Sequence, residues 1–176
     1  NRDRSIGLFS GFAIMSLTCL LIETIEQFWT GNIQSSRKGK TGEMENCFTK
    51  LFNSTKNEIS NDALTFFNFF QRSGNFKSFF DTPEKANIFY TKIRCGLLHQ
   101  GQTKGKSLIH IRASEPMLNW IDQENISEGI SVQRRLFVKE VRVVYEKYIS
   151  ELENPNNLNF RRQTLEKKMK YIVQQK

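Results

Sequence analysis

The stretch Thr82–Gly101, TPEKANIFYTKIRCGLLHQG, carries the clearest helix signals in the chain. Thr82 can cap a helix, Pro83 suits its first turn, and Gly101 is placed to end it. Between these limits apolar residues recur at helical spacing, which predicts one amphipathic helix. These apolar positions are Ala86, Phe89, Tyr90, Ile93, Leu97 and Leu98. We expect the rest of the chain to form a helical scaffold that presents the end of this helix.

Upstream, Ser5–Ile22 contains no charged residue and continues without a break into Glu23, Glu26 and Trp29. Its length touches the lower limit for a membrane span. Small and polar residues dilute it, however, so the pattern favours a long buried helix of a soluble bundle, apolar nearly all round. A membrane or targeting segment is the alternative, and we expect no stable membrane insertion.

The next segments read as a loop followed by two helices. Gly31–Gly42 is polar and glycine-rich, which is typical of a loop. Glu43–Phe52 has helical spacing, and a second helix is expected through Arg72 from a cap at Asn61 or Asp62. In that helix Leu64, Phe67 and Phe70 are expected to face inward. The many phenylalanines here indicate a core rather than a surface on which bases stack.

Downstream of Gly101, a short β segment and two more helices are expected. Ser107–Ala113 alternates and is rich in isoleucine, which predicts a strand, with a second between Met117 and Ile121 or near Ile130. Ser131 can cap a helix to about Leu152. The expected inward residues of that helix are Phe137, Val141, Val144, Tyr148 and Leu152, with Arg134, Arg135 and Arg142 off this stripe. Those of the last helix are Leu158, Leu165, Met169 and Ile172. The prediction is one mainly all-α domain over residues 1–176, with a small β-hairpin insertion within about 107–131.

The formal net charge of +8 and the pI of about 9.5 favour polyanionic partners. Nucleic acid comes first and an anionic membrane surface second. Candidate RNA contacts are Lys104, Lys106, Arg134 and Arg135. The three cysteines lack metal-ligand spacing, which indicates reduced thiols and a cytoplasmic protein. We expect neither a metal nor another cofactor.

Arg94 and His99 are the candidate catalytic pair. A guanidinium can clamp a phosphate, and an imidazole can move a proton near neutral pH, so together they could cleave RNA by attack of its own 2′-hydroxyl. Five residues on a regular helix turn by about 140 degrees, so the two side chains would not share a face. They converge only if the helix frays or tightens at its end, or if a second subunit completes the site. The alternative is a helix cap at His99 and a surface charge at Arg94. His110, the other histidine, is expected on the solvent side of its strand.

The Arg-x4-His spacing near a helix end, with its context IRCGLLHQGQTKG, resembles the HEPN superfamily of small helical proteins. The order of elements is also similar: a long first helix, the motif helix, a small β excursion and two further helices. The resemblance implies a metal-independent endoribonuclease of the toxin or host-defence type. It also implies a homodimer with a composite site, and an antitoxin or other regulatory partner. An acid from the first helix, Glu23 or Glu26, would face the site.

A non-catalytic HEPN-like module that binds RNA or a protein is the second hypothesis. Members of the superfamily often carry a polar residue directly after the arginine, commonly asparagine, and here that position is Cys95. This departure favours the binding module. RNA binding that survives removal of His99, without cleavage, would distinguish it from the enzyme.

Overall fold

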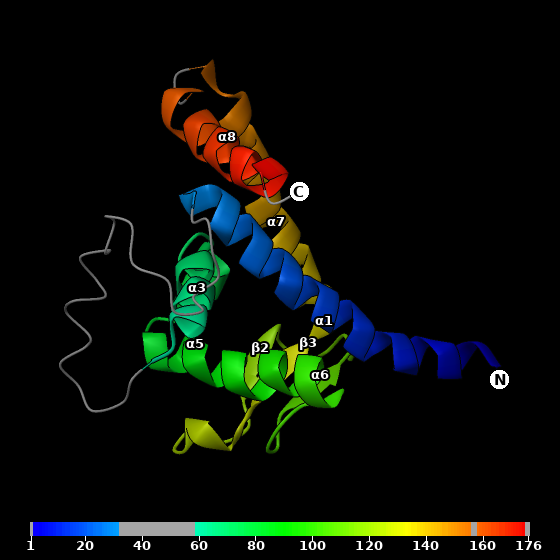
Figure 1. Cartoon of the computed structure of the whole chain (residues 1–176). Helices are drawn as coiled ribbons and strands as arrows, with labels where there is room; N and C mark the ends of the chain where they lie inside the picture. The colour runs from blue at the N-terminus through cyan, green and yellow to red at the C-terminus, as the bar shows by residue number, and fades with distance from the viewer. Residues whose placement is uncertain (1, 32–58, 156–157, 175–176) are drawn as a thin grey trace.

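A computed structural model describes residues 2–31, 59–155 and 158–174, with side chains from Ser10 onward in the first range and from Phe160 onward in the last. The chain is mainly helical, as predicted, with one small sheet (Figure 1). The predicted helix Glu43–Phe52, Cys47 and all of the predicted loop except Gly31 lie outside these ranges.

Helix α1 (Arg2–Thr30) buries one face and exposes the other. Met15, Cys19, Ile22, Ile25 and Trp29 recur every three or four residues and are buried, as expected for a core helix. A second set of apolar side chains remains exposed: Phe12, Ile14, Leu17, Leu20 and Leu21. Within the described ranges, only α1 is long and apolar enough to cross a membrane, over Ser10–Thr30.

Phenylalanine rings build the core, as predicted. Ser60 caps helix α3 (Asn61–Phe70), and Ser73 caps helix α4 (Gly74–Phe79). Helix α4 was not predicted from the sequence. Phe70 stacks on Phe80 with 4.0 Å between ring centroids. The expected inward position in α3 was wrong for Leu64, whereas Phe67 is half-buried and packs against the core. The face that packs between α1 and α5 carries instead the buried Ala63, Phe66, Phe69 and Phe70.

The predicted motif helix forms as one helical segment with three parts: α5 (Pro83–Phe89), η1 (Tyr90–Arg94) and α6 (Cys95–Gln100). Thr82 caps it, with its hydroxyl oxygen accepting from the Lys85 amide at 3.4 Å. Gly101 ends it in the left-handed conformation, at φ 67°. Segment η1 is a π-helical turn, in which the Cys95 amide donates to the Tyr90 carbonyl. This turn was not predicted from the sequence.

The β excursion is a three-stranded mixed sheet, so the predicted β-hairpin was incomplete. Its strands are β1 (Leu108–His110), β2 (Leu118–Trp120) and β3 (Ile130–Gln133), in the order β1-β3-β2. β1 is parallel to β3, and β2 is antiparallel to it. The two positions predicted as alternatives for a second strand, Met117–Ile121 and the region near Ile130, both form strands. The buried β3 pairs with β1 along one edge and with β2 along the other.

Helix α7 (Arg134–Glu153) buries Phe137, Val141, Val144 and Tyr148, as predicted, while Leu152 is half-buried. The predicted cap was wrong. Ser131 lies within β3, and the side chain of Gln133 accepts from the Leu136 amide at 3.0 Å instead. The chain passes directly from strand to helix, which leaves Gln133 as the N-cap.

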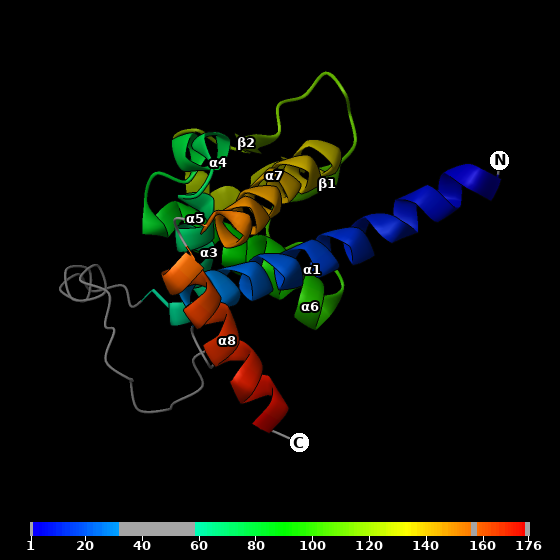
Figure 2. The same ribbon diagram turned by 90° about the horizontal axis from the view of Figure 1, so that it is seen from above.

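Helix α8 (Leu158–Gln174) packs across α1 and α7 (Figure 2). The prediction that Met169 and Ile172 face inward was wrong, since their exposed fractions are 46% and 44%. Leu165 is half-buried, and the Leu158 side chain lies outside the described part. The side of α8 that faces α1 and α7 carries Arg161 and Lys168, which donate to polar groups of those helices.

Candidate functional site

Arg94 is anchored to α1 by Glu23. Its Nε donates to Glu23 Oε1 at 2.6 Å, and its Nη2 donates to Glu23 Oε2 at 3.2 Å. Both side chains are largely buried, with 16% and 17% exposed. Burial disfavours the charged guanidinium, but the hydrogen bond and charge of Glu23 outweigh burial and raise the pKa of Arg94. Arg94 is therefore a fixed cation with donors left over.

Tyr90 and Cys95 also lie beside Arg94. The Tyr90 ring lies 5.3 Å from the guanidinium carbon, and its hydroxyl donates to Asp62 Oδ2 at 3.1 Å. Burial raises the pKa of the Tyr90 phenol, and so does its contact with Cys95. Sequence reasoning missed Tyr90, although its i,i+4 spacing from Arg94 places the two on one helix face.

His99 lies exposed in the last turn of α6. Its imidazole makes no hydrogen bond or ion pair with any residue that the structure describes. The helix remains α-helical from Cys95 to Gln100, so the fraying or tightening that would let Arg94 and His99 converge within one chain does not occur. The helix widens before Arg94 instead, in η1. Arg94 faces α1 while His99 faces solvent, so the two side chains do not meet within one chain.

The loop after His99 folds back onto the motif helix. The Lys104 amide donates to the Lys92 carbonyl at 2.8 Å, and the Gln102 amide donates to the Gly96 carbonyl at 3.4 Å. A Cβ at Gly96 would lie 2.4 Å from the Gln102 carbonyl oxygen. By itself, a glycine at position 96 would only weaken the helix. The structure shows that it allows this close approach.

Gly96→Ala should destabilise the fold by about 1–3 kcal/mol, because a backbone carbonyl must move to admit the methyl group. Urea unfolding would measure the change. Gly74→Ala is the matched control, since nothing lies within 4 Å of a Cβ there, and alanine in that helix should be neutral or stabilising by up to about 1 kcal/mol. Equal effects of the two substitutions would contradict this role of Gly96.

The four candidate RNA contacts differ in their surroundings. Lys106 pairs with Glu128 at 2.7 Å, and Arg134 lies against α1, where its Nη1 would be 2.6 Å from a Cβ at Gly11. Lys104 is half-buried and Arg135 is exposed. Arg135 therefore offers the freest guanidinium of the set, while Lys106 and Arg134 already have neighbours.

Glu26 and His110 lie outside the surroundings of Arg94. Glu26 pairs with Arg72, so Glu23 is the acid of α1 that meets Arg94. The expected solvent position of His110 was wrong, since its side chain is only 12% exposed. Its Nδ1 accepts from the Arg112 amide at 3.3 Å, and its Nε2 approaches Glu115 Oε2 at 3.3 Å without the alignment of a hydrogen bond. The turn after β1 folds over the ring.

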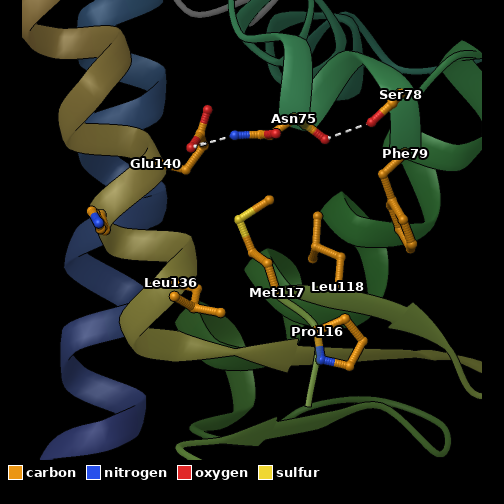
Figure 3. A pocket seen from close by; sticks show the side chains of 9 residues that line it. Asn75, Ser78, Phe79, Pro116, Met117, Leu118, Leu136 and Glu140 are labelled. Atoms are coloured by element: carbon orange, nitrogen blue, oxygen red, sulfur yellow. Dashed lines mark hydrogen bonds between the residues drawn. The ribbon is translucent and has the colours of Figure 1, made fainter. Parts of the chain in front are cut away.

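A separate pocket of about 480 Å³ lies between α4, the start of β2 and α7 (Figure 3). Met117, Leu118 and Leu136 give it apolar walls, and Asn75 donates to Glu140 at its rim over 3.0 Å. Arg94, His99 and Glu23 do not line it. No group of three or more His, Cys, Asp or Glu side chains in the described ranges is placed to hold a metal ion.

The geometry thus consists of a buried guanidinium tied to α1 and a free imidazole five residues further along the same helical segment. Such groups can bind a phosphate and move a proton. Comparisons with protein-family models, with curated proteins and with solved structures found no match to this chain.

Proposed function

We propose that the chain is a metal-independent endoribonuclease of the toxin or host-defence type, acting as a cytoplasmic homodimer of the HEPN kind. The observation that carries the proposal is the motif helix itself. It holds one guanidinium rigidly through Glu23 and leaves one histidine free at its end. The Arg-x4-His resemblance and the basic charge of +8 support RNA as the substrate.

In the proposed reaction the 2′-hydroxyl oxygen of a ribose attacks the adjacent phosphorus, and the bond from phosphorus to the 5′-oxygen breaks. At each site one His99 takes the proton of the 2′-hydroxyl and returns it to the departing 5′-oxygen. Arg94 stabilises the negative charge on the phosphorane. Glu23 is a positioning residue, since it orients Arg94. The products end in a 2′,3′-cyclic phosphate and a 5′-hydroxyl.

A dimer is needed because Arg94 and His99 face different sides of one chain. The exposed apolar face of α1 offers a surface for it, and α1 packs against α6, which carries His99. Leu17, at 66% exposed, lies on this face. A second copy covering it would bring the two motif helices closer together, whereas an uncovered apolar stripe of this length is unusual in a monomer.

Leu17→Glu should shift the chain from dimer to monomer, because it places a charge in the proposed interface. The loss in association affinity should be at least about tenfold, measured by light scattering after size-exclusion chromatography. Val143→Glu on α7 is the matched control, since Val143 is also exposed, at 47%. A wild type that stays monomeric at high concentration would contradict the dimer.

The proposal is tested by incubating labelled single-stranded RNA with the full chain in EDTA. We expect cleavage with 2′,3′-cyclic phosphate ends, which a kinase that labels 5′-hydroxyls and a cyclic phosphodiesterase would identify. Products with 5′-phosphates, or cleavage that requires an added divalent ion, would contradict this mechanism. An antitoxin or other regulatory partner would be a protein that blocks this cleavage.

A second candidate is a binding module without catalysis. The observation that favours it is Cys95, which takes the position after Arg94 that is commonly polar in the superfamily. The bidentate contact of Arg94 with Glu23 also occupies part of the guanidinium. RNA binding by the wild type without any cleavage, unchanged by His99→Ala, would establish this alternative.

A further inference from the structure

The inward side of α8 is polar. Arg161 donates to the Trp29 carbonyl and to Glu151, each at 2.8 Å. Lys168 donates to Gln27 Oε1 at 2.9 Å and is only 7% exposed. Cations thus make the hydrogen bonds that join α8 to α1 and α7, and Leu165 is half-buried beside them.

The outward side of α8 carries the apolar residues. Ile172 and Val173 lie three and four residues after Met169, so both neighbour Met169 on one side of the helix. The exposed fractions of Met169, Ile172 and Val173 are 46%, 44% and 62%, and Phe160 near the helix start is 57% exposed. A shallow hollow runs between Met169 and Val173. The C-terminal turns stand away from the other helices (Figure 2). This face is open to a partner.

The charge of α8 indicates what that partner is. Residues 158–174 hold five cations against one carboxylate, a net of +4. Arg162 and Lys167 are exposed, and Lys170 pairs with the single acid, Glu166, at 2.6 Å on the surface. A second copy of α8 would set like charges against each other. RNA would use the cations, but Met169, Ile172 and Val173 are not aromatic and provide no stacking surface for bases. An anionic bilayer suits both features.

We propose that α8 docks the chain on an anionic lipid bilayer surface. Met169, Ile172 and Val173 enter the boundary between headgroups and acyl chains, and Arg162 and Lys170 lie against lipid phosphates. Lys167, on the opposite side of the helix, adds to the attraction at longer range. The helix lies in the plane of the interface without spanning the membrane. This surface is separate from Arg94 and His99, so the proposal does not depend on ribonuclease activity.

The test is co-sedimentation of the full chain with vesicles of phosphatidylglycerol mixed with phosphatidylcholine, and with vesicles of phosphatidylcholine alone. We expect binding only to the anionic vesicles, weakened by salt. Lys167→Gln/Lys170→Gln should lower the affinity on the order of 30-fold, from two surface charges. Met169→Ser/Val173→Ser should lower it at least about tenfold. Val143→Ser, at an exposed valine of α7, should change nothing.

Four results would overturn the proposal: no binding to anionic vesicles, equal binding to neutral ones, double variants that bind like the wild type, or loss of binding by Val143→Ser. Circular dichroism checks that each variant is folded. If Met169→Ser/Val173→Ser instead converts a dimer to a monomer, this face is a subunit interface. If Lys167→Gln/Lys170→Gln loses RNA and not vesicles, the face holds nucleic acid. Either outcome also rejects the bilayer.

Discussion

His99→Ala should reduce RNA cleavage by roughly 10²- to 10⁴-fold, the usual contribution of a positioned general acid or base. The imidazole is exposed and makes no hydrogen bond within the described ranges, so its removal should leave the free energy of unfolding nearly unchanged. The measurement is the rate of cleavage of labelled RNA in EDTA, with circular dichroism as the check on folding. His110→Ala is the matched control, because it removes the only other histidine.

Full activity of His99→Ala, or an equal loss in His110→Ala, would contradict the assignment. Arg94 needs a gentler substitution, because alanine would leave Glu23 as a largely buried carboxylate without its partner. Arg94→Gln keeps an amide donor near Glu23 and removes the positive charge. It should also lose cleavage, since a neutral amide cannot stabilise the charge of the phosphorane.

Mixing the two inactive variants tells whether the site spans two chains. If Arg94 of one chain works with His99 of the other, a heterodimer of Arg94→Gln and His99→Ala keeps one intact site and regains part of the activity. If each chain supplies both groups to its own site, every site in the mixture lacks one group and the mixture stays inactive. The outward position of His99 and the inward position of Arg94 predict recovery.

The helix ends of the motif segment were predictable because their signals are local. The Thr82 cap and the Gly101 stop depend only on neighbouring backbone groups. The internal geometry of the helix between these two ends was harder to predict from the sequence. The π turn Tyr90–Arg94 has no clear sequence signal, and the packing on Gly96 depends on a loop that returns from Gln102. Such contacts are set by tertiary structure.

The error in the inward face of α8 has a physical origin. Amphipathic periodicity locates the apolar side of a helix and assumes that this side meets the core. In α7 the assumption holds for Phe137 and Val144, whereas in α8 it fails for Met169 and Ile172. The partners that α8 meets are a carbonyl, an amide and the carboxylate of Glu151, which select Arg161 and Lys168 instead. Apolar periodicity alone contains no information about such polar partners.

Arg72→Met should destabilise the fold by about 3–5 kcal/mol, because it leaves a buried carboxylate without its cation. Arg72 donates from Nε and Nη2 to the two oxygens of Glu26, both at 2.6 Å, and Glu26 is only 3% exposed. The guanidinium carbon also lies 4.2 Å from the centroid of the Trp29 ring. Methionine preserves much of the contact with the ring and removes the charge. Chemical denaturation at neutral pH would measure the loss.

Two controls separate the buried charge from lost packing. Arg142 and Glu146 form a surface ion pair whose side chains are 77% and 57% exposed. Arg142→Met should therefore lower the free energy of unfolding by less than about 1 kcal/mol. Arg72→Met/Glu26→Leu removes both charges and should recover most of the stability, because an apolar pair can replace a buried ion pair. A double variant as unstable as Arg72→Met would show that packing, and not charge, is lost.

The pH dependence of Arg72→Met follows from Glu26. Burial raises the pKa of Glu26 in the folded protein, and the hydrogen bond and charge of Arg72 oppose that rise. Without Arg72 the folded pKa rises further, so the folded state binds a proton at a pH where the unfolded state does not. The stability of the variant relative to wild type should therefore increase as pH falls through this raised pKa, and level off below the folded pKa of wild-type Glu26, which itself lies above the ordinary value of 4.5. A gap between variant and wild type that stays constant from pH 7 to about pH 5 would contradict a charged Glu26 as its cause.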